Sequence, residues 1–332
     1  MPNLNAAETR AVADLLRSTP VVTRLGEAFA AAGHELFLVG GSVRDVLLGR
    51  LGHDLDFTTS ARPDIIEELM GPLASTLWTM GRDFGTIGGR IDGLDIEITT
   101  FRSEAYRPDS RKPEVAFGDT LEGDLVRRDF TVNAMALSVT DAPGSDGAEI
   151  PSGSFRDPHG GLADLAGRVL RTPGTAEDSV TDDPLRMMRA ARFSAQLGFR
   201  PVPEVVAAMT ALSDRISIIS AERVREELSK LLLTDGPRVG LDLLVATGIA
   251  DHVLPELPAL RLERDEHHRH KDVYQHSLTV LEQAIDLEER LEVRPDLINR
   301  LAALLHDIGT PRTRKFEAGG KVSFHHHDVV GA

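Results

Sequence analysis

Cysteine is absent from the 332 residues of this chain. Its absence excludes disulfides, cysteine–zinc sites and thiol catalysis, so any metal must be held by His, Asp, Glu or carbonyl oxygen. A run of about 18 apolar residues is also missing, and we therefore expect no segment that spans a membrane. The first residues lack a basic segment followed by an apolar stretch, so we expect no secretory signal peptide. Together these absences predict a cytoplasmic protein.

Positive charge is also scarce. The chain has 37 Lys and Arg residues against 52 Asp and Glu residues, which gives a formal net charge of −15 at pH 7. A protein whose whole surface binds nucleic acid is usually basic, so any contact with RNA must be local. The apolar fraction is an ordinary 41 %, and the length predicts two or three domains with sizeable cores.

Strand and helix patterns mix in the first 150 residues, whereas nearly every segment after residue 178 has a helical pattern. The stretch at residues 141–161 is rich in Gly, Pro, Ser and Asp and is the best candidate for a domain boundary. We predict an α+β protein. An N-terminal α/β head with a mixed sheet spans residues 1–150, a helical neck and body spans 151–265, and a further helical domain spans 266–332.

A pair of carboxylates is the first candidate site. Asp54 and Asp56 lie two residues apart in a strand pattern, so both side chains point to one face while Leu55 and Phe57 face a core. Two carboxylates this close repel each other and favour a cation between them. Mg²⁺ binds hard oxygen ligands and leaves room for water and substrate phosphates.

A second alternating strand pattern at residues 94–101 offers another pair of acids. Asp95 and Glu97 share one face of this strand, and a neighbouring strand of this kind can supply a third carboxylate to the pair. The alternative for both segments is a solvated strand that carries surface acids.

Two glycines and a serine precede the first pair. Gly40, Gly41 and Ser42 follow a short apolar strand pattern and open a predicted helix. Glycines in this position let backbone N–H groups approach a phosphate, and the helix N-terminus adds a positive field. Arg44 can reach the same anion. The alternative is an ordinary strand-to-helix turn.

The stretch from residue 40 to residue 57 resembles the first motif of the class II nucleotidyltransferases. This branch of the DNA polymerase β-like superfamily contains the tRNA CCA-adding enzymes and the bacterial poly(A) polymerases. Four further motifs follow in family order: residues 127–134 resemble the ribose and phosphate motif, 157–164 the hinge, 182–193 the nucleotide-selecting motif and 222–228 the helix-stabilising motif. The family usually has Glu where this chain has Asp182.

The resemblance implies untemplated nucleotidyl transfer with two Mg²⁺ ions held by Asp54 and Asp56. They would activate a 3′-hydroxyl and stabilise the leaving pyrophosphate, with Glu97 as a further ligand or a base. The implied nucleotide-binding residues are Gly40, Gly41, Ser42, Arg44, Arg128, Asp129, Asn133, Asp183, Arg186, Arg189 and Arg192. For Arg127 and Arg128, the alternative is a pair of surface arginines ahead of a buried helix at residues 130–137.

Base selection is the expected role of Asp183 and Arg186. They lie three residues apart at a predicted helix start and so share a face. A carboxylate beside a guanidinium matches the donor and acceptor edges of cytosine and adenine, and mismatches guanine and uracil. The alternative is a helix-capping Asp with an intrahelical ion pair. Arg189 and Arg192 continue the three-residue spacing. They either contact RNA or the triphosphate, or they line a solvated stripe of the helix.

The C-terminal histidines form a second pattern. His276, His306, Asp307 and His327 resemble the ligands of the HD phosphohydrolase domain, over roughly residues 270–332. Such ligands suit a second divalent metal. The pattern's last Asp should lie downstream of Ala332, so we expect a shortened chain with poor metal affinity. The alternative is a helical scaffold without catalysis.

The leading hypothesis is therefore a tRNA nucleotidyltransferase that restores the 3′ CCA end from CTP and ATP. The partners are the tRNA 3′ end and the two nucleotides, and no protein partner is inferred. The alternatives are a poly(A) polymerase of the same family, a metal-dependent HD phosphohydrolase with the head as a nucleotide sensor, and a non-catalytic RNA-binding module. The paired acids Asp54 and Asp56 argue against the last, because burying them without a metal is costly.

Overall fold

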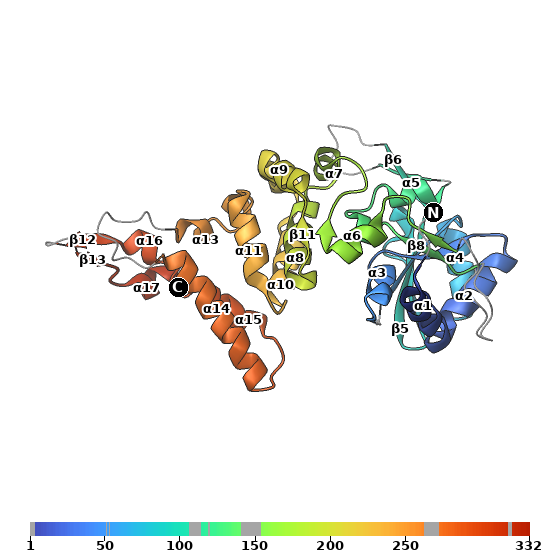
Figure 1. The fold of residues 1–332 in the computed structure, drawn as a ribbon, viewed down its shortest axis with the longest axis horizontal. Coiled ribbons are helices and arrows are strands. Elements are labelled where there is room, and N and C mark those ends of the chain that lie inside the picture. The colour runs from blue at the N-terminus through green and yellow to red at the C-terminus, as the bar shows by residue number, and fades with distance from the viewer. Residues whose placement is uncertain are drawn as a thin grey trace. The chain divides into compact units, whose positions relative to one another are not determined.

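The computed structural model describes residues 4–50, 52, 54–105, 114–118, 120–140, 154–261, 272–317 and 321–332. The chain divides into two compact units, Met1–Thr175 and Ala176–Ala332, and each is described by itself (Figure 1). The predicted boundary at residue 150 lies outside the described residues, and the division into three domains stays a prediction. No helix of the described chain is long and apolar enough to cross a membrane.

A seven-stranded mixed sheet forms the centre of the first unit, in the strand order β3-β4-β5-β2-β1-β8-β9. Strands β2 and β5 are parallel, and the other neighbours are antiparallel. The prediction of an α/β head with a mixed sheet is thus confirmed. The strands are β1 (Leu36–Val39), β2 (Asp54–Thr59), β3 (Thr76–Trp78), β4 (Thr86–Ile91), β5 (Leu94–Thr100), β8 (Ala136–Ser138) and β9 (Phe155–Arg156).

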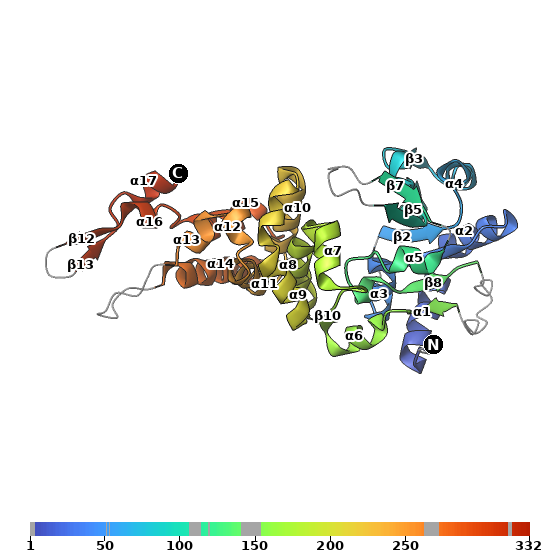
Figure 2. The same cartoon turned by 90° about the horizontal axis from the view of Figure 1, so that it is seen from above.

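Helices cover one face of this sheet and leave part of the other face open to solvent. Helices α2 and α4 lie side by side (Figures 1 and 2), and a Cβ on Gly89 of β4 would touch Met70 of α4. Leu55 and Phe57 are buried, whereas Asp54 and Asp56, which alternate with them along β2, are exposed. The helices of this unit are α1 (Ala6–Ser18), α2 (Pro20–Ala31), α3 (Gly41–Leu47), α4 (Pro63–Met70), α5 (Leu121–Leu125) and α6 (Gly161–Gly167), with 3-10 turns η1 (Arg82–Phe84) and η2 (Thr131–Asn133). The short strands β6 (Arg102–Ala105), β7 (Glu114–Phe117) and β10 (Val169–Leu170) complete it.

The segment at residues 130–137 is not the buried helix that the alternative for the two arginines required. It forms the 3-10 turn η2 and then enters strand β8, which pairs with β1 and β9. That part of the alternative is wrong. The sequence pattern could not show this, because a short apolar run has no periodicity that distinguishes a buried strand from a buried helix.

The second unit is almost entirely helical, as predicted. Its exceptions are β11 (Arg200–Pro201) and the hairpin of β12 (Lys315–Glu317) and β13 (Lys321–Ser323). The helices are α7 (Ala176–Asp182), α8 (Leu185–Leu197), α9 (Pro203–Ala211), η3 (Ser213–Ile218), α10 (Ala221–Leu232), α11 (Pro237–Ala246), α12 (Ala250–Val253), α13 (Glu256–Ala259), α14 (Val273–Arg290), α15 (Leu297–Leu305), α16 (Thr310–Thr313) and α17 (His327–Gly331).

A buried arginine joins the later helices of this unit to α10. Arg300 of α15 is only 2 % exposed and donates from Nε and Nη2 to Glu288 of α14, at 2.9 and 2.7 Å. Its Nη1 donates to the carbonyls of Leu232 and Thr234, where α10 ends. Removing one partner of such a buried pair costs about 3–5 kcal/mol, so this contact fixes α14 and α15 against α10.

Candidate active site and a second candidate metal centre

The parallel pairing of β2 with β5 brings four carboxylates to one face of the sheet. Asp54 is the register partner of Asp95, and Asp56 is the register partner of Glu97. Directly opposed residues on neighbouring strands point to the same side. The two acidic strand patterns therefore meet on the exposed face, as their spacing predicts.

Asp95 and Glu97 have opposite electrostatic surroundings, although both lie on β5. Arg90 of β4 donates to both carboxylate oxygens of Asp95, at 2.7 and 2.8 Å, and this hydrogen bonding lowers the pKa of Asp95. The pKa of Glu97 is raised, first by partial removal of its carboxyl group from water and then by the negative charges of Asp56 and Asp54. The negative charge of Asp95 is thus balanced by Arg90, whereas the cluster of Glu97, Asp56 and Asp54 favours an added cation.

The glycine turn lies directly beside this cluster. Gly40 has φ of 68° and ψ of −138°, which favour glycine, and an added Cβ would lie 3.0 Å from Arg128 Nη1 and 3.8 Å from Asp56 Oδ2. The Ser42 hydroxyl accepts from the Asp56 amide at 3.0 Å and is 3.4 Å from the Asp54 carbonyl, to which it donates. Ser42 therefore fixes the start of α3 against the strand that carries the acids.

Arg44 lies in a buried network and not at an open anion site. It is 5 % exposed and donates to both oxygens of Asp45, at 2.8 and 2.9 Å. Its Nη1 donates to Asn133 at 2.7 Å, and Asn133 in turn donates to Asp129 at 2.9 Å. This chain of polar groups connects the first motif to the second, so Arg44, Asn133 and Asp129 hold the two motifs together.

An open pocket of about 250 Å³ borders the cluster. Asp56 and Glu97 line it together with Arg128, which is held by Asp124 at 3.0 Å. Its polar lining consists of Asp56, Glu97, Thr99, Arg102, Asp124, Arg127 and Arg128. Carboxylate oxygens and guanidinium groups in one pocket can hold a cation together with a phosphate.

A second pocket, of about 190 Å³, is lined by Gly41, Ser42, Asp45, Asp54 and Asp56 among others. Asp56 thus borders both pockets, whereas Asp54 lines only the second. Two pocket residues were not predicted as part of this site. Arg102 was expected only in a basic cluster that could contact RNA, and nothing in the sequence distinguishes the buried Asp124 from the other acids of the chain.

In the second unit, Asp183 lies just before α8 and accepts two hydrogen bonds. Its Oδ1 accepts from the Leu185 amide at 3.1 Å, and its Oδ2 accepts from Arg223 of α10 at 3.0 Å. Arg186 donates from Nη1 to the Ser179 hydroxyl at 2.8 Å. The carboxylate and the guanidinium are therefore both positioned by neighbouring helices, and Arg223 belongs to the motif expected to stabilise this region.

Arg189 and Arg192 both face Glu227 of α10. Arg192 is 8 % exposed and donates to Glu227 at 2.7 Å, and Arg189 lies 3.6 Å from the other oxygen. The solvated stripe that was the alternative for these residues is wrong for Arg192, because α10 covers it. The expected contact of these two arginines with a nucleotide or RNA stays a prediction.

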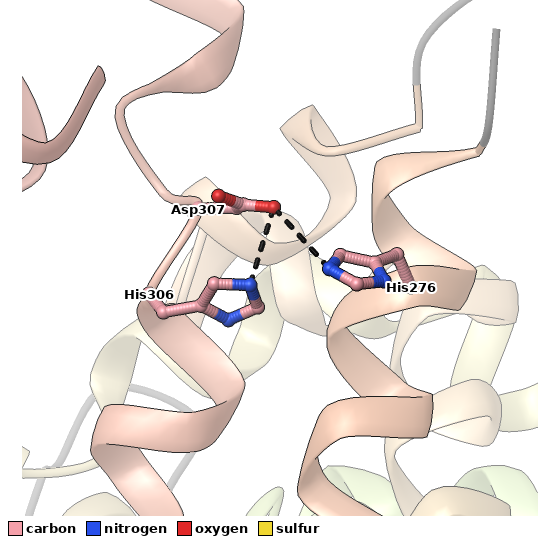
Figure 3. A group of neighbouring side chains, drawn as sticks. All are labelled: His276, His306 and Asp307. Carbon is pink, nitrogen blue, oxygen red and sulfur yellow. Dashed lines mark ion pairs between the residues drawn. The ribbon is translucent and has the colours of Figure 1, made fainter. Parts of the chain in front are cut away.

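The histidine pattern converges around one carboxylate. Asp307 lies just after α15, and its Oδ2 is 3.2 Å from Nε2 of His306 and 3.8 Å from Nε2 of His276 on α14 (Figure 3). Candidate ligand atoms of these three residues all lie within 4.8 Å of one another. Nε2 of His327, at the start of α17, is 3.4 Å from the other oxygen of Asp307. The structure thus brings together all four residues of the predicted second metal site.

The ring orientation of two of these histidines suits metal binding. Nδ1 of His306 donates to the carbonyl of Ala303 at 2.9 Å, and Nδ1 of His327 donates to the carbonyl of Phe324 at 2.8 Å. A histidine whose Nδ1 carries the proton presents the lone pair of Nε2 to a ligand. Both lone pairs then point toward Asp307.

Three family models match consecutive parts of the chain. The poly(A) polymerase head domain matches residues 36–171, the probable RNA and SrmB-binding site of polymerase A matches 198–260, and the HD domain matches 273–332. The head domain contains both acidic strands and the glycine turn, and the HD domain contains Asp307 and the three histidines around it.

Curated relatives and solved structures agree with these models. The chain is 43 % identical to the CCA-adding enzyme of Levilactobacillus brevis over 66 % of its own length and 51 % of the relative's. It is 38 % identical to that of Lactobacillus gasseri over 74 % and 56 %. The chain therefore spans about half the length of the curated relatives it matches.

Among solved structures, the Bacillus stearothermophilus CCA-adding enzyme in complex with CTP matches with a TM-score of 0.60 and 30 % identity. That match covers 87 % of this chain and 65 % of the other. A tRNA nucleotidyltransferase complexed with a primer tRNA and an incoming ATP analogue matches with a TM-score of 0.64 and 26 % identity, over 85 % and 74 %.

Proposed function

Because the chain belongs to the class II nucleotidyltransferase family that includes the CCA-adding enzymes, we propose that it adds or repairs the 3′ CCA end of tRNA. The substrates are CTP, ATP and a tRNA 3′ end, and pyrophosphate is released at each step. No nucleic-acid template takes part in this reaction.

The register of β2 with β5 is the observation that carries the proposal. It aligns Asp56 with Glu97 on an exposed face, next to a glycine turn and a fixed arginine. Phosphoryl-type transfer depends on alignment and on neutralisation of phosphate charge more than on covalent help from the protein. This face offers both kinds of group within one pocket.

The donor set fits Mg²⁺, since Asp54, Asp56 and Glu97 offer oxygen ligands. The pKa of Glu97 is raised first by burial and then by the charges of Asp56 and Asp54. When bound by Asp54 and Asp56, Mg²⁺ would supply activation of the attacking 3′-hydroxyl and stabilisation of the leaving pyrophosphate. Arg128 presents a fixed positive charge beside Asp56 that binds a phosphate. The backbone at Gly40 and Gly41 admits that phosphate, and Ser42 keeps β2 in place beneath it.

Asp183 and Arg186 are the residues we assign to base selection. Asp183 offers an acceptor and Arg186 offers donors, the complement of the edges of cytosine and adenine. Arg223 and Ser179 hold the two side chains in fixed positions. Such positioning costs less entropy on binding than ordering two mobile side chains.

The test is incorporation into a tRNA transcript that lacks its last three nucleotides, with Mg²⁺ and each labelled nucleotide added separately and then together. We expect addition of C, C and A in order, followed by termination. Long runs of A made from ATP alone would show poly(A) polymerase activity and would contradict CCA addition. No incorporation of any nucleotide, by a folded protein with bound Mg²⁺, would contradict both.

A second activity is favoured by the convergence of three Nε2 atoms on Asp307. We propose that these residues hold a divalent metal and that this part of the chain hydrolyses a phosphomonoester or phosphodiester. Imidazole and carboxylate ligands suit a transition metal, which would supply an activated water near neutral pH. Metal analysis and hydrolysis of a model phosphodiester test this without tRNA.

A further inference from the structure

The single tryptophan of the chain packs against a glycine of the neighbouring strand. Trp78 on the edge strand β3 is the register partner of Gly88 on β4. A Cβ built on Gly88 would lie only 1.8 Å from Trp78 Nε1 and 2.4 Å from its Cε2. The indole therefore occupies the space that any other residue at position 88 would fill.

The same register row contains the catalytic carboxylates. Gly88 pairs with Glu97 on β5, and Glu97 pairs with Asp56 on β2. Directly opposed residues share a face, so the Trp78 indole lies on the exposed face that carries the acids. With neighbouring strands about 4.8 Å apart, Trp78 is about 10 Å from Glu97 and about 14 Å from Asp56 along this row.

A cationic side chain lies one row away on the same face. Arg102 donates from Nη2 to the Thr86 hydroxyl at 2.9 Å and from Nε to the Phe84 carbonyl at 3.0 Å. Thr86 is next but one to Gly88 on β4, and Arg102 also lines the pocket with Asp56 and Glu97. Arg102 thus lines the acidic pocket and is held on β4 two residues from Gly88, the register partner of Trp78.

We propose that Trp78 is a stacking platform for an unpaired base of the RNA substrate near its 3′ end, with Arg102 contacting the adjoining phosphate. The proposal rests on the proposed function, because it places the RNA whose 3′-hydroxyl reacts beside Asp56. An aromatic face next to a cation is the combination that binds single-stranded nucleic acid without reading its sequence. Trp78 is half-buried, so one side of its indole is held while part of it stays accessible.

Tolerance of different bases is what this reaction needs at such a position. The base next to the growing end changes with each addition, and every base has a π-face that an indole can cover. A hydrogen-bonding side chain would favour one base and disfavour the next. The absence of a side chain at Gly88 leaves room for the indole against β4.

Intrinsic fluorescence gives a direct readout, because Trp78 is the only tryptophan. The full 332-residue chain is titrated with a tRNA transcript lacking its last three nucleotides, in the absence of nucleotides. We expect strong quenching by this transcript and by a short single-stranded oligonucleotide, and little by a blunt RNA duplex. Equal quenching by all three, or quenching by CTP alone as large as that by RNA, would overturn the proposal.

Variants separate stacking from simple packing. Trp78→Leu should weaken RNA binding by about 5- to 100-fold, the range expected for one base stacked on an aromatic residue. KM for CTP should stay within about twofold, and Trp78→Phe should recover most of the RNA affinity. If Trp78→Leu lowers only the melting temperature, or Trp78→Phe binds RNA as weakly as Trp78→Leu, the indole is a packing group and the proposal fails.

A change at Gly88 provides a second route should Trp78→Leu fold poorly. Gly88→Ala displaces the indole without removing it, so we expect RNA affinity to fall while CTP affinity is kept. In a Trp78→Leu background, Gly88→Ala should have little further effect, because the two changes act on the same contact. Additive losses would contradict the proposal. If the wild type is quenched by RNA but adds no nucleotide, the stacking site stands and the proposed reaction fails.

Discussion

The two acidic centres of this chain are built on opposite principles. In the first unit, Asp54, Asp56 and Glu97 lie on two parallel strands and are all negative. In the second unit, a single carboxylate, Asp307, is surrounded by imidazoles at helix ends. The first is an arrangement of hard oxygen ligands around unbalanced charge, and the second is a mixed nitrogen and oxygen set.

The two centres differ in how their folds position the candidate ligands. A strand pair fixes its side chains through register, so like charges are kept close together. The pKa of Glu97 is raised first by burial and then by the charges of Asp56 and Asp54. A helix end has no such register, and there the ligands are oriented one by one, as by the carbonyls of Ala303 and Phe324. We therefore expect the two centres to bind different metals and to be separable by mutation.

The largest effect is expected from Asp56→Asn. Even groups that only orient metal ligands cost about 10–100-fold when removed, so loss of a ligand should lower nucleotide incorporation by at least about 100-fold. The matched control is Asp95→Asn. Asp95 is the register partner of Asp54, but its charge is already paired with Arg90. Asp95→Asn should stay within a few-fold of wild type, as measured by single-turnover addition of CTP.

The fold should survive Asp56→Asn, because the change removes a repelling charge from the exposed face. An unchanged melting temperature together with lost incorporation supports the assignment. If the Asp56→Asn variant incorporates nucleotides within a few-fold of the wild-type rate, Asp56 is not a metal ligand of the reaction.

The reverse experiment is His306→Ala. It removes one of the Nε2 atoms that face Asp307 and should lower bound transition metal, measured by elemental analysis, by at least about 10-fold. Addition of C and A to tRNA should be unchanged. His252→Ala, on an exposed histidine of α12, is the control and should keep the metal. Equal loss of both activities in His306→Ala would show that the two centres are not independent.

Base choice should respond to Asp183→Ala. A bidentate contact is worth about 1–3 kcal/mol of discrimination, so the preference for CTP and ATP over UTP and GTP should fall by about 5- to 150-fold. Arg186→Ala should act in the same direction. A lower rate with an unchanged preference would assign these residues some other role.

The ion pair to Asp183 allows a finer test. Arg223→Ala removes the guanidinium that positions the carboxylate, so it should relax the preference less than Asp183→Ala does. Arg225→Ala, on the same helix and exposed, is the control and should leave the preference unchanged.

The smallest effect concerns stability. The pKa of Glu97 is raised in the folded chain, so ionised Glu97 destabilises the fold above that pKa and has no effect below the pKa of the unfolded chain. Glu97→Gln should therefore raise the melting temperature of the metal-free protein slightly at pH 7. The gain should vanish as the pH falls to the range where both states are protonated. Added Mg²⁺ should stabilise the wild type more than the variant.

Much of the N-terminal head could be predicted from the sequence. The two-residue spacing of Asp54 and Asp56 requires a shared face in any strand, and the motifs predicted the head and the HD domain that the family models match. These features are local, since they depend on strand period, on the conformational freedom of glycine and on residue order.

Other features were decided only by tertiary structure. Nothing in the spacing of Asp95 and Glu97 says that Arg90 neutralises one and leaves the other beside Asp56, because that depends on which strands pair and in what register. The burial of Arg44 and Arg192 likewise depends on helices distant in sequence. The position of the Trp78 indole requires an absent side chain on another strand. The sequence thus determined which groups are present, and long-range packing decided which of their charges and faces remain available.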